Sequence, residues 1–217
     1  MKKATAVILD TLYQRYPLLT VCQTDIQSAF ALLYKAFQSG HKLLVCGNGG
    51  SAADSGHIAS ELMKAFKLPR PLPEKHRAAL WAAFPREGDG LAEGLQQGLP
   101  VIDLTANGPL MTAYANDADA SMVFAQQVYG YGRPGDALLG ISTSGSAVNV
   151  IRAVQTARAF GLAALGLTGQ SGGVLAGLCD VCVRVPAAET YIVQELHLPV
   201  YHALCAALES EFFGFEG

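Results

Sequence analysis

Residues 42–62 read KLLVCGNGGSAADSGHIASEL, and the order of residue types in this stretch decides the fold class. The short apolar run at 42–47 predicts a buried strand. A glycine-rich turn follows, and residues 51–66 are predicted to form a helix with small residues in its first turn. A strand, a turn and a helix in this order are typical of one unit of a parallel sheet covered by helices.

A second unit of the same kind lies at residues 136–160, where DALLGI predicts a buried strand, STSGS a turn and residues 147–160 a helix. Further strands are predicted at 99–104, 162–167 and 180–185. We therefore expect an α/β fold, with a doubly wound, mainly parallel sheet flanked by helices on both faces.

Other helices are predicted outside these two units. Apolar residues recur at helical spacing through 25–38, and Gly40 is a suitable stop signal. Residues 121–129 and 189–213 also read as helices, and an N-terminal helix is expected. Residues 67–100 differ, because prolines interrupt two short helical stretches there. We predict one domain spanning 1–217, with 67–100 as a helical insertion packed on it.

The composition narrows the classes of function. The chain has 217 residues, of which 51% are hydrophobic and 15% charged, and its net charge is −3. So few charges indicate either a large core or apolar surface covered by other subunits. No block of Lys or Arg suggests nucleic acid or membrane binding. No signal peptide and no apolar run of ~18 residues is present, so a cytoplasmic location is predicted.

The five cysteines do not predict a disulfide framework, because their number is odd and their spacing is wide. Cys179 and Cys182 have the spacing of a redox or zinc motif. They lie, however, where a turn enters a predicted strand, and no second pair of this kind exists. We therefore interpret them as inert.

Two turns at predicted strand ends are suited to an anion. Gly47–Ser51 lets the backbone approach a ligand, and Ser142–Ser146 adds hydroxyl donors; each precedes a predicted helix N-terminus. Neutral donors of this kind fit a phosphate monoester. The pattern is neither a P-loop nor a dinucleotide-binding fingerprint. The alternative is that both are tight turns with serine N-caps.

Histidine, carboxylate and amide side chains are paired on two predicted helices. His57 and Glu61 are four residues apart and so share one helix face. Gln194 and His202 are eight apart, about 80° from each other around the helix. Such a set suits zinc, or a general base and acid facing one ligand. Alternatively, the first pair is a surface ion pair. His197 points elsewhere and is expected to be structural.

Residues 46–62 (CGNGGSAADSGHIASEL) and 140–153 (GISTSGSAVNVIRA) resemble the signature loops of the sugar isomerase (SIS) domain family. Together with VQELHLPVYH at 193–202, they resemble its phosphoheptose isomerase branch. The resemblance implies an SIS-type fold and the conversion of sedoheptulose 7-phosphate to D-glycero-D-manno-heptose 7-phosphate through an enediolate. It also implies a homotetramer with sites at subunit interfaces and one Zn²⁺ per site.

The resemblance further implies residue roles. Glu61 would be the base that moves a proton between C1 and C2, and His202 the partner acid. The implied zinc ligands are His57, Glu61, Gln194 and His202. The residues implied to bind the sugar phosphate are Asn48, Gly49, Gly50, Ser51, Asp117, Ser142, Thr143, Ser144, Ser146 and Gln194.

Three positions depart from the family's pattern: Ala147 replaces a loop serine, Ala65 an arginine beside Lys64, and Tyr191 an aspartate. These positions belong to substrate recognition, so pentose and hexose phosphates stay open as substrates. A second reading is a non-catalytic SIS protein that binds phosphosugars or the bacterial replication initiator. Such an adaptor is expected to lack Glu61 and His202, which favours the enzyme.

Overall fold

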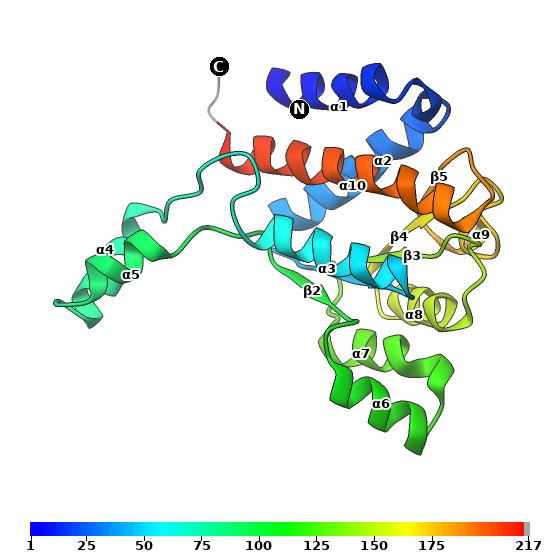
Figure 1. Ribbon diagram of the computed structural model, residues 1–217. Helices are drawn as coiled ribbons and strands as arrows, with labels where there is room; N and C mark the ends of the chain where they lie inside the picture. Colours follow the sequence, from blue (N-terminus) through cyan, green and yellow to red (C-terminus); the bar gives the residue numbers. More distant parts are fainter. Residues whose placement is uncertain (215–217) are drawn as a thin grey trace.

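A five-stranded, wholly parallel sheet forms the centre of the computed structural model, which describes residues 1–214 (Figure 1). Its spatial order is β2–β1–β3–β4–β5, and every neighbouring pair is parallel. The strands are β1 (Leu43–Gly47), β2 (Val101–Asp103), β3 (Ala137–Ile141), β4 (Ala163–Thr168) and β5 (Val181–Arg184). The predicted α/β class and the parallel sheet are thus confirmed.

Ten α-helices and two short 3₁₀ helices, η1 (Pro17–Cys22) and η2 (Ala120–Met122), lie within the described residues. The α-helices are α1 (Lys3–Arg15), α2 (Gln23–Gln38), α3 (Gly50–Met63), α4 (Glu74–Ala83), α5 (Gly88–Gly94), α6 (Gly108–Asp117), α7 (Val123–Tyr131), α8 (Val148–Ala159), α9 (Leu175–Leu178) and α10 (Thr190–Phe213). None of the helices between residues 1 and 214 combines the length and apolar character needed to cross a bilayer.

The sheet separates two apolar layers. Along β1, Leu43 and Val45 pack into a core built with α1, α2, α3 and α10, whereas Leu44 and Cys46 face a second core under α7 and α8. This alternation follows from the two-residue period of a strand. Helices therefore cover both faces, as a doubly wound sheet requires.

The strand order places a topological switch point between β1 and β3. The chain leaves β1, reaches the edge as β2, and returns to form β3 on the other side of β1. In the register, Gly47 at the end of β1 lies opposite Ile141 at the end of β3. The two predicted anion turns consequently begin side by side, at the switch point where open α/β sheets bind ligands.

The 67–100 segment contains α4 and α5, which pack on each other and extend away from the body (Figure 1). Its base is attached to the body: the Leu99 amide donates to the Leu62 carbonyl at 2.9 Å. An isolated bridge joins Pro71 to Gln96, and the Gln97 amide donates to the Arg70 carbonyl at 2.8 Å. The assignment of the whole chain to one domain carrying this insertion stays a prediction.

Candidate functional site

The first turn leads directly into α3. Gly49 has φ +56°, a left-handed conformation that glycine adopts without strain, and it is the N-cap residue of α3. Ser51 is buried, and its carbonyl accepts the Ser55 hydroxyl at 2.9 Å. A Cβ at Gly50 would lie only 2.5 Å from Nε2 of Gln194. Gln194, in the first turns of α10, therefore packs directly against this glycine turn.

Backbone hydrogen bonds connect the second turn to the segment that follows β4. Gly145 has φ +66°, and its amide donates to the Ser142 carbonyl at 2.9 Å. The Gly169 amide donates to the Thr143 carbonyl at 2.9 Å, and the Leu175 amide to that of Gly145 at 3.0 Å. The Ser144 hydroxyl accepts the Ser146 amide at 3.2 Å. These backbone hydrogen bonds therefore fix the conformation of the hydroxyl-bearing turn against the segment after β4.

An amide pair joins the two turns. Nδ2 of Asn48 donates to Oδ1 of Asn149 at 2.9 Å, and Nδ2 of Asn149 donates back to Oδ1 of Asn48 at 2.9 Å. Asn149 is the second residue of α8, just after the hydroxyl turn. Sequence reasoning predicted Asn48 but missed Asn149, whose partner lies 101 residues away. Its position at a helix N-terminus beside the predicted anion turn was the available signal.

A cluster of imidazole and carboxylate groups lies between α3 and α10. Nε2 of His57 is 3.2 Å from Oε1 of Glu61 and 3.3 Å from Nε2 of His202. Burial lowers the pKa of His202, and the neighbouring imidazole of His57 lowers it further, against the opposing effect of Glu61. The structure thus brings together both predicted catalytic residues and three of the four predicted metal ligands, from helices about 140 residues apart in the chain.

A cation accompanies the carboxylate. Nζ of Lys64 is 3.2 Å from Oε2 of Glu61, and it also donates to the carbonyl of Ala65 at 3.3 Å. Lys64 therefore places a positive charge beside Glu61 next to the position where the family's pattern has an arginine. Its side chain is 57% exposed, so solvent reaches this charge.

Asp54 and Tyr201 border the cluster, and neither was predicted. The Tyr201 hydroxyl donates to Oδ1 of Asp54 at 3.2 Å and lies 3.0 Å from Nδ1 of His57. Burial raises the pKa of Asp54, while the Tyr201 hydroxyl and His57 act in the opposite direction. Burial and the adjacent Asp54 carboxylate raise the pKa of Tyr201. In the sequence, Tyr201 looks like an ordinary core aromatic on the apolar face of a long helix, and nothing there marks it as a site residue.

Two residues singled out in the sequence, Asp117 and His197, take no part in the contacts described above. Asp117 ends α6 on the surface, where its Oδ1 accepts Nδ2 of Asn116 at 2.9 Å. No hydrogen bond or ion pair within residues 1–214 joins Asp117 to the other candidate residues. His197 is fully buried on α10, and its two ring nitrogens have no partner among the described residues. Burial lowers its pKa to about 4, so it is neutral near pH 7. Its predicted structural role is consistent with this burial.

Histidine and carboxylate side chains are residue types that bind zinc in proteins. Among residues 1–214, no group of three or more His, Cys, Asp and Glu side chains is arranged so that it could hold a metal ion. Two separations nevertheless suit one: ligand atoms bound to a tetrahedral zinc at 2.0–2.1 Å lie roughly 3.3 Å apart. The distances from Nε2 of His57 to Glu61 and to His202 are 3.2 and 3.3 Å. In residue type and in these two separations, His57, Glu61 and His202 match zinc ligands, although the three side chains as they stand do not form a site that could hold the ion.

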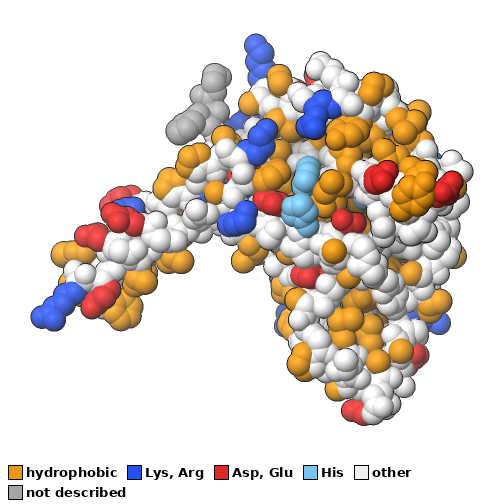
Figure 2. Space-filling model, viewed as in Figure 1, with side chains coloured by type: hydrophobic (Ala, Val, Ile, Leu, Met, Phe, Trp, Pro, Cys, Tyr) orange, Lys and Arg blue, Asp and Glu red, His pale blue; other side chains and the backbone are white. Residues whose placement is uncertain are grey.

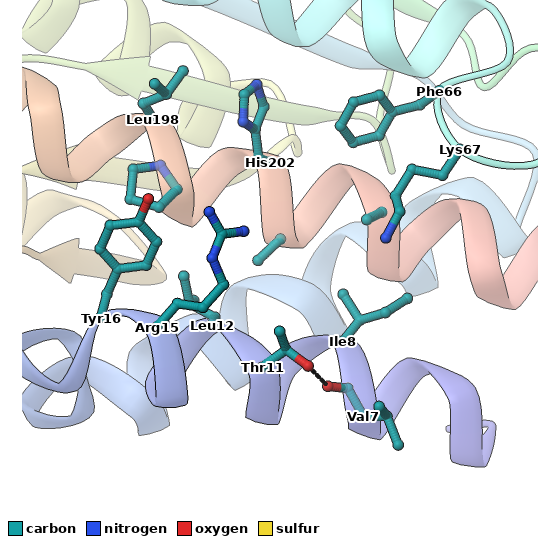
Figure 3. Close-up of a pocket in the computed structure, with 13 residues that line it drawn as sticks. Val7, Ile8, Thr11, Leu12, Arg15, Tyr16, Phe66, Lys67, Leu198 and His202 are labelled. Carbon is teal, nitrogen blue, oxygen red and sulfur yellow. Dashed lines mark hydrogen bonds between the residues drawn. The ribbon is translucent and has the colours of Figure 1, made fainter.

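A cavity of about 540 Å³ lies beside His202, between α1 and α10 (Figure 3). Its walls are mostly apolar, with Ile8 and Leu12 on one side and Leu198 on the other. Arg15 and Lys67 add positive charge at its edges. Figure 2 shows histidine side chains on this face with acidic side chains close by and apolar surface around them. Within the cluster, His202 is thus accessible from this cavity.

Comparisons with known proteins agree with this geometry. The SIS domain family matches residues 18–82 and 75–169. The phosphoheptose isomerase of Crocosphaera subtropica is 38% identical over 192 residues, covering 88% of this chain and 85% of that protein. The phosphoheptose isomerase of Nitratidesulfovibrio vulgaris is 41% identical over 174 residues, covering 80% and 71%.

Solved structures give the same result. The phosphoheptose isomerase GmhA from Neisseria gonorrhoeae superposes with a TM-score of 0.73 and 30% identity, covering 96% of this chain and 97% of that one. A phosphoheptose isomerase from Francisella tularensis superposes with a TM-score of 0.74 and 28% identity over the same shares.

Proposed function

Because the chain belongs to the SIS domain family and, within it, to the phosphoheptose isomerases, we propose that it interconverts a ketose phosphate and an aldose phosphate. The leading substrate is sedoheptulose 7-phosphate and the product D-glycero-D-manno-heptose 7-phosphate. The observation that carries the proposal is the meeting of Glu61 and His57, on the helix that begins at the glycine turn, with His202 of α10.

The cluster contains the groups that this reaction requires. An aldose–ketose shift needs a base at carbon and a proton source at oxygen, and it passes through an enediolate. Glu61 is the base that moves the proton between C1 and C2. His202 reaches the same point from α10 and exchanges the proton of the substrate oxygens. Its lowered pKa keeps the ring neutral near pH 7, so that it both accepts and donates a proton.

The two turns would hold the phosphate through neutral donors. Two helix N-termini, those of α3 and α8, supply positive dipole ends there. The predicted ligands are Asn48, Gly49, Gly50, Ser51, Ser142, Thr143, Ser144 and Ser146. Gln194, against Gly50, lies where it can contact the sugar. Asp117 would need to contact the sugar from the surface end of α6.

The proposed cofactor is one zinc ion per site, held by His57, Glu61, His202 and Gln194. A divalent cation there supplies Lewis-acid stabilisation of the negative charge that develops on the substrate oxygens. The protein's own contribution is to orient these donors: two residues of α3 and two of α10 approach from different sides. The spacings given above support this assignment.

We further propose that the enzyme acts as a homotetramer with sites at subunit interfaces. The support is exposed apolar surface on α1 and η1, where Val7, Leu18 and Val21 are 55%, 53% and 76% exposed, and Val7 also lines the cavity. Exposed apolar patches of this kind mark protein–protein contacts. A cytoplasmic location stays a prediction. The adaptor alternative is disfavoured because Glu61, His57 and His202 are present and converge.

The proposal is tested by replacing Glu61 with Gln, which keeps size and removes the base. We expect turnover of sedoheptulose 7-phosphate to fall by at least about 100-fold, within the usual contribution of general base catalysis. Binding should change only a few-fold, and the melting temperature should be preserved. The matched control is Glu93→Gln on the exposed α5. Wild-type turnover in Glu61→Gln would remove Glu61 from the mechanism.

A further inference from the structure

The Tyr201 hydroxyl lies between a carboxylate and an imidazole. It is 3.2 Å from Oδ1 of Asp54 and 3.0 Å from Nδ1 of His57. Asp54 and His57 are three residues apart on α3, whereas Tyr201 comes from α10. The reaction proposed above assigns no role to Asp54 or Tyr201. Their arrangement nevertheless determines what His57 can do.

The direction of the hydrogen bonds follows from counting protons. A tyrosine hydroxyl has one proton, and this proton is donated to Asp54. The oxygen of Tyr201 can then take part in the contact with Nδ1 of His57 only as an acceptor. With Asp54 ionised and the hydroxyl proton in that bond, Nδ1 carries the proton of the neutral imidazole, which leaves Nε2 with a free lone pair.

The free lone pair points at other electron-pair donors. Nε2 of His57 faces Oε1 of Glu61 at 3.2 Å, and a carboxylate oxygen is also an acceptor. Two acceptors at this distance repel each other unless a cation or a shared proton lies between them. Nε2 of His202, 3.3 Å away, faces the same point. A cation shared by the three groups, or a proton carried by Nε2 of His202 and donated to His57, therefore stabilises this arrangement.

We propose that Asp54 and Tyr201 are positioning residues which fix the Nδ1–H tautomer of His57 and so aim its Nε2 lone pair at a divalent cation shared with Glu61 and His202. The part concerning turnover rests on the proposed function, whereas the tautomer does not. An outer partner that orients a ligating histidine in this way typically changes metal affinity or activity by about 10- to 100-fold.

Packing keeps the hydroxyl in place. Tyr201 is 2% exposed, and its ring packs edge-on against His57 and His202, with centroids 5.5 and 5.0 Å away. Oδ2 of Asp54 is buried and has no partner among the described residues. The hydroxyl thus has no access to an alternative acceptor in solvent. Its bond to Asp54 and its contact with His57 form one unit.

The tautomer is tested directly by NMR on metal-free protein with ¹⁵N-labelled histidine. Long-range proton–nitrogen spectra show which ring nitrogen is protonated, and His57→Asn identifies the His57 signals. We expect Nδ1–H in the wild type and a mixture of tautomers in Tyr201→Phe. A wild-type spectrum with the proton on Nε2, or an unchanged tautomer in Tyr201→Phe, would overturn the inference.

Metal affinity gives a second readout, with Co²⁺ as the probe because its bound form absorbs visible light. We expect Tyr201→Phe to weaken Co²⁺ binding about 10- to 100-fold. The matched control is Tyr13→Phe, which removes another buried hydroxyl that has no partner among the described residues. Equal Co²⁺ affinity in the wild type and Tyr201→Phe would contradict the positioning role.

Kinetics separate positioning from a merely structural effect. In Tyr201→Phe we expect kcat to fall about 10- to 100-fold with KM changed less than about threefold, because the phosphate turns are untouched. If Tyr201→Phe does not fold, Asp54→Leu removes the acceptor of the hydroxyl proton and must show the same tautomer mixture. Should the wild type lack isomerase activity yet show the Nδ1–H tautomer and Co²⁺ binding, the proposed function fails and the orientation of His57 stands.

Discussion

Removing one partner of the buried Arg70–Glu209 ion pair should destabilise the fold strongly and separate α3 from α10. Nε of Arg70 is 2.9 Å from Oε1 of Glu209, and the two residues are 1% and 0% exposed. The guanidinium also donates to the carbonyls of Leu62 and Glu61, at 2.7 and 3.1 Å. The pair therefore ties the end of α3, which carries Glu61, to the helix that carries His202.

The size of the effect follows from the groups left unpaired. The Glu209 carboxylate also accepts the backbone amides of residues 66, 67 and 68, at 2.8, 2.8 and 3.1 Å. An uncompensated buried charge costs about 3–5 kcal/mol. We therefore expect Glu209→Gln, which keeps the volume, to lower the free energy of unfolding by about 3–5 kcal/mol. That loss is a large share of the ~5–15 kcal/mol of a typical domain.

Urea unfolding followed by circular dichroism, at one fixed protein concentration, measures this loss. Arg70→Met should be as costly as Glu209→Gln, and the double variant should recover at least about 2 kcal/mol relative to the sum of the single losses. The control is Arg158→Met, which breaks an exposed pair with Asp180 at 3.9 Å and should cost less than about 1 kcal/mol. A loss below about 1 kcal/mol in Glu209→Gln, or no coupling in the double variant, would refute this reasoning.

Three further predictions concern the anion turns, the buried histidine and the metal. Asn149→Ala removes the partner of the Asn48 side-chain amide, so KM for the sugar phosphate should rise about tenfold while kcat is nearly unchanged. A tenfold change corresponds to about 1.4 kcal/mol of binding free energy. Steady-state kinetics with Gln155→Ala as the control measures this change, and an unchanged KM contradicts the prediction. The pKa of His197 is about 4 in the folded protein and ~6.5 in the unfolded chain. The contribution of its neutral form to stability is therefore complete above pH 6.5. As the pH falls to 4.5, the free energy of unfolding should decrease by about 2–3 kcal/mol. Urea unfolding at pH 7 and 4.5 should show this loss in the wild type but not in His197→Leu; equal losses would exclude His197 as its source. Chelation should reduce turnover at least about tenfold and Zn²⁺ should restore it, whereas full activity in metal-free protein, verified by metal analysis, would exclude a catalytic metal.

The sheet was predictable because its strands are short, continuous apolar runs buried on both faces, followed by glycine or hydroxyl turns. The end of helix α3, in contrast, was not predicted correctly. The predicted helix continues to residue 66, but α3 stops at Met63 because the Glu209 carboxylate accepts the amides of Phe66 and Lys67. That partner lies more than 140 residues away, so no local pattern reveals it.

The helix α6 was also missed, although the chain contains local signals for it. The Asn107 side chain accepts the Leu110 amide at 3.2 Å, and Pro109 occupies the first turn. An asparagine N-cap followed by proline is a usual helix start. The predicted strand at 99–104 is reduced to Val101–Asp103, because β2 is an edge strand that pairs with β1 alone.

At the candidate site, residues on one helix were predictable and contacts between helices were not. The four-residue spacing of His57 and Glu61 places them on one face, as observed. His202 and His57 are 145 residues apart in the chain. Their residue types suggested that the two helix pairs could face one ligand, but only the family resemblance assigned them to one site. Tyr201 was overlooked because a buried tyrosine in an apolar helix usually belongs to the core. Its hydroxyl acquires a role only through two partners on α3.

The proposed isomerase activity is tested most directly by following the hydrogen that is transferred between C1 and C2. Sedoheptulose 7-phosphate is incubated with the purified protein in D₂O and followed by NMR. We predict that aldose phosphate accumulates to a constant ratio with deuterium at C2, because Glu61 exchanges its proton with solvent between the two transfers. If folded protein at saturating substrate forms no aldose phosphate and exchanges no hydrogen at C1 or C2, the convergence of α3 and α10 does not make an isomerase of this substrate.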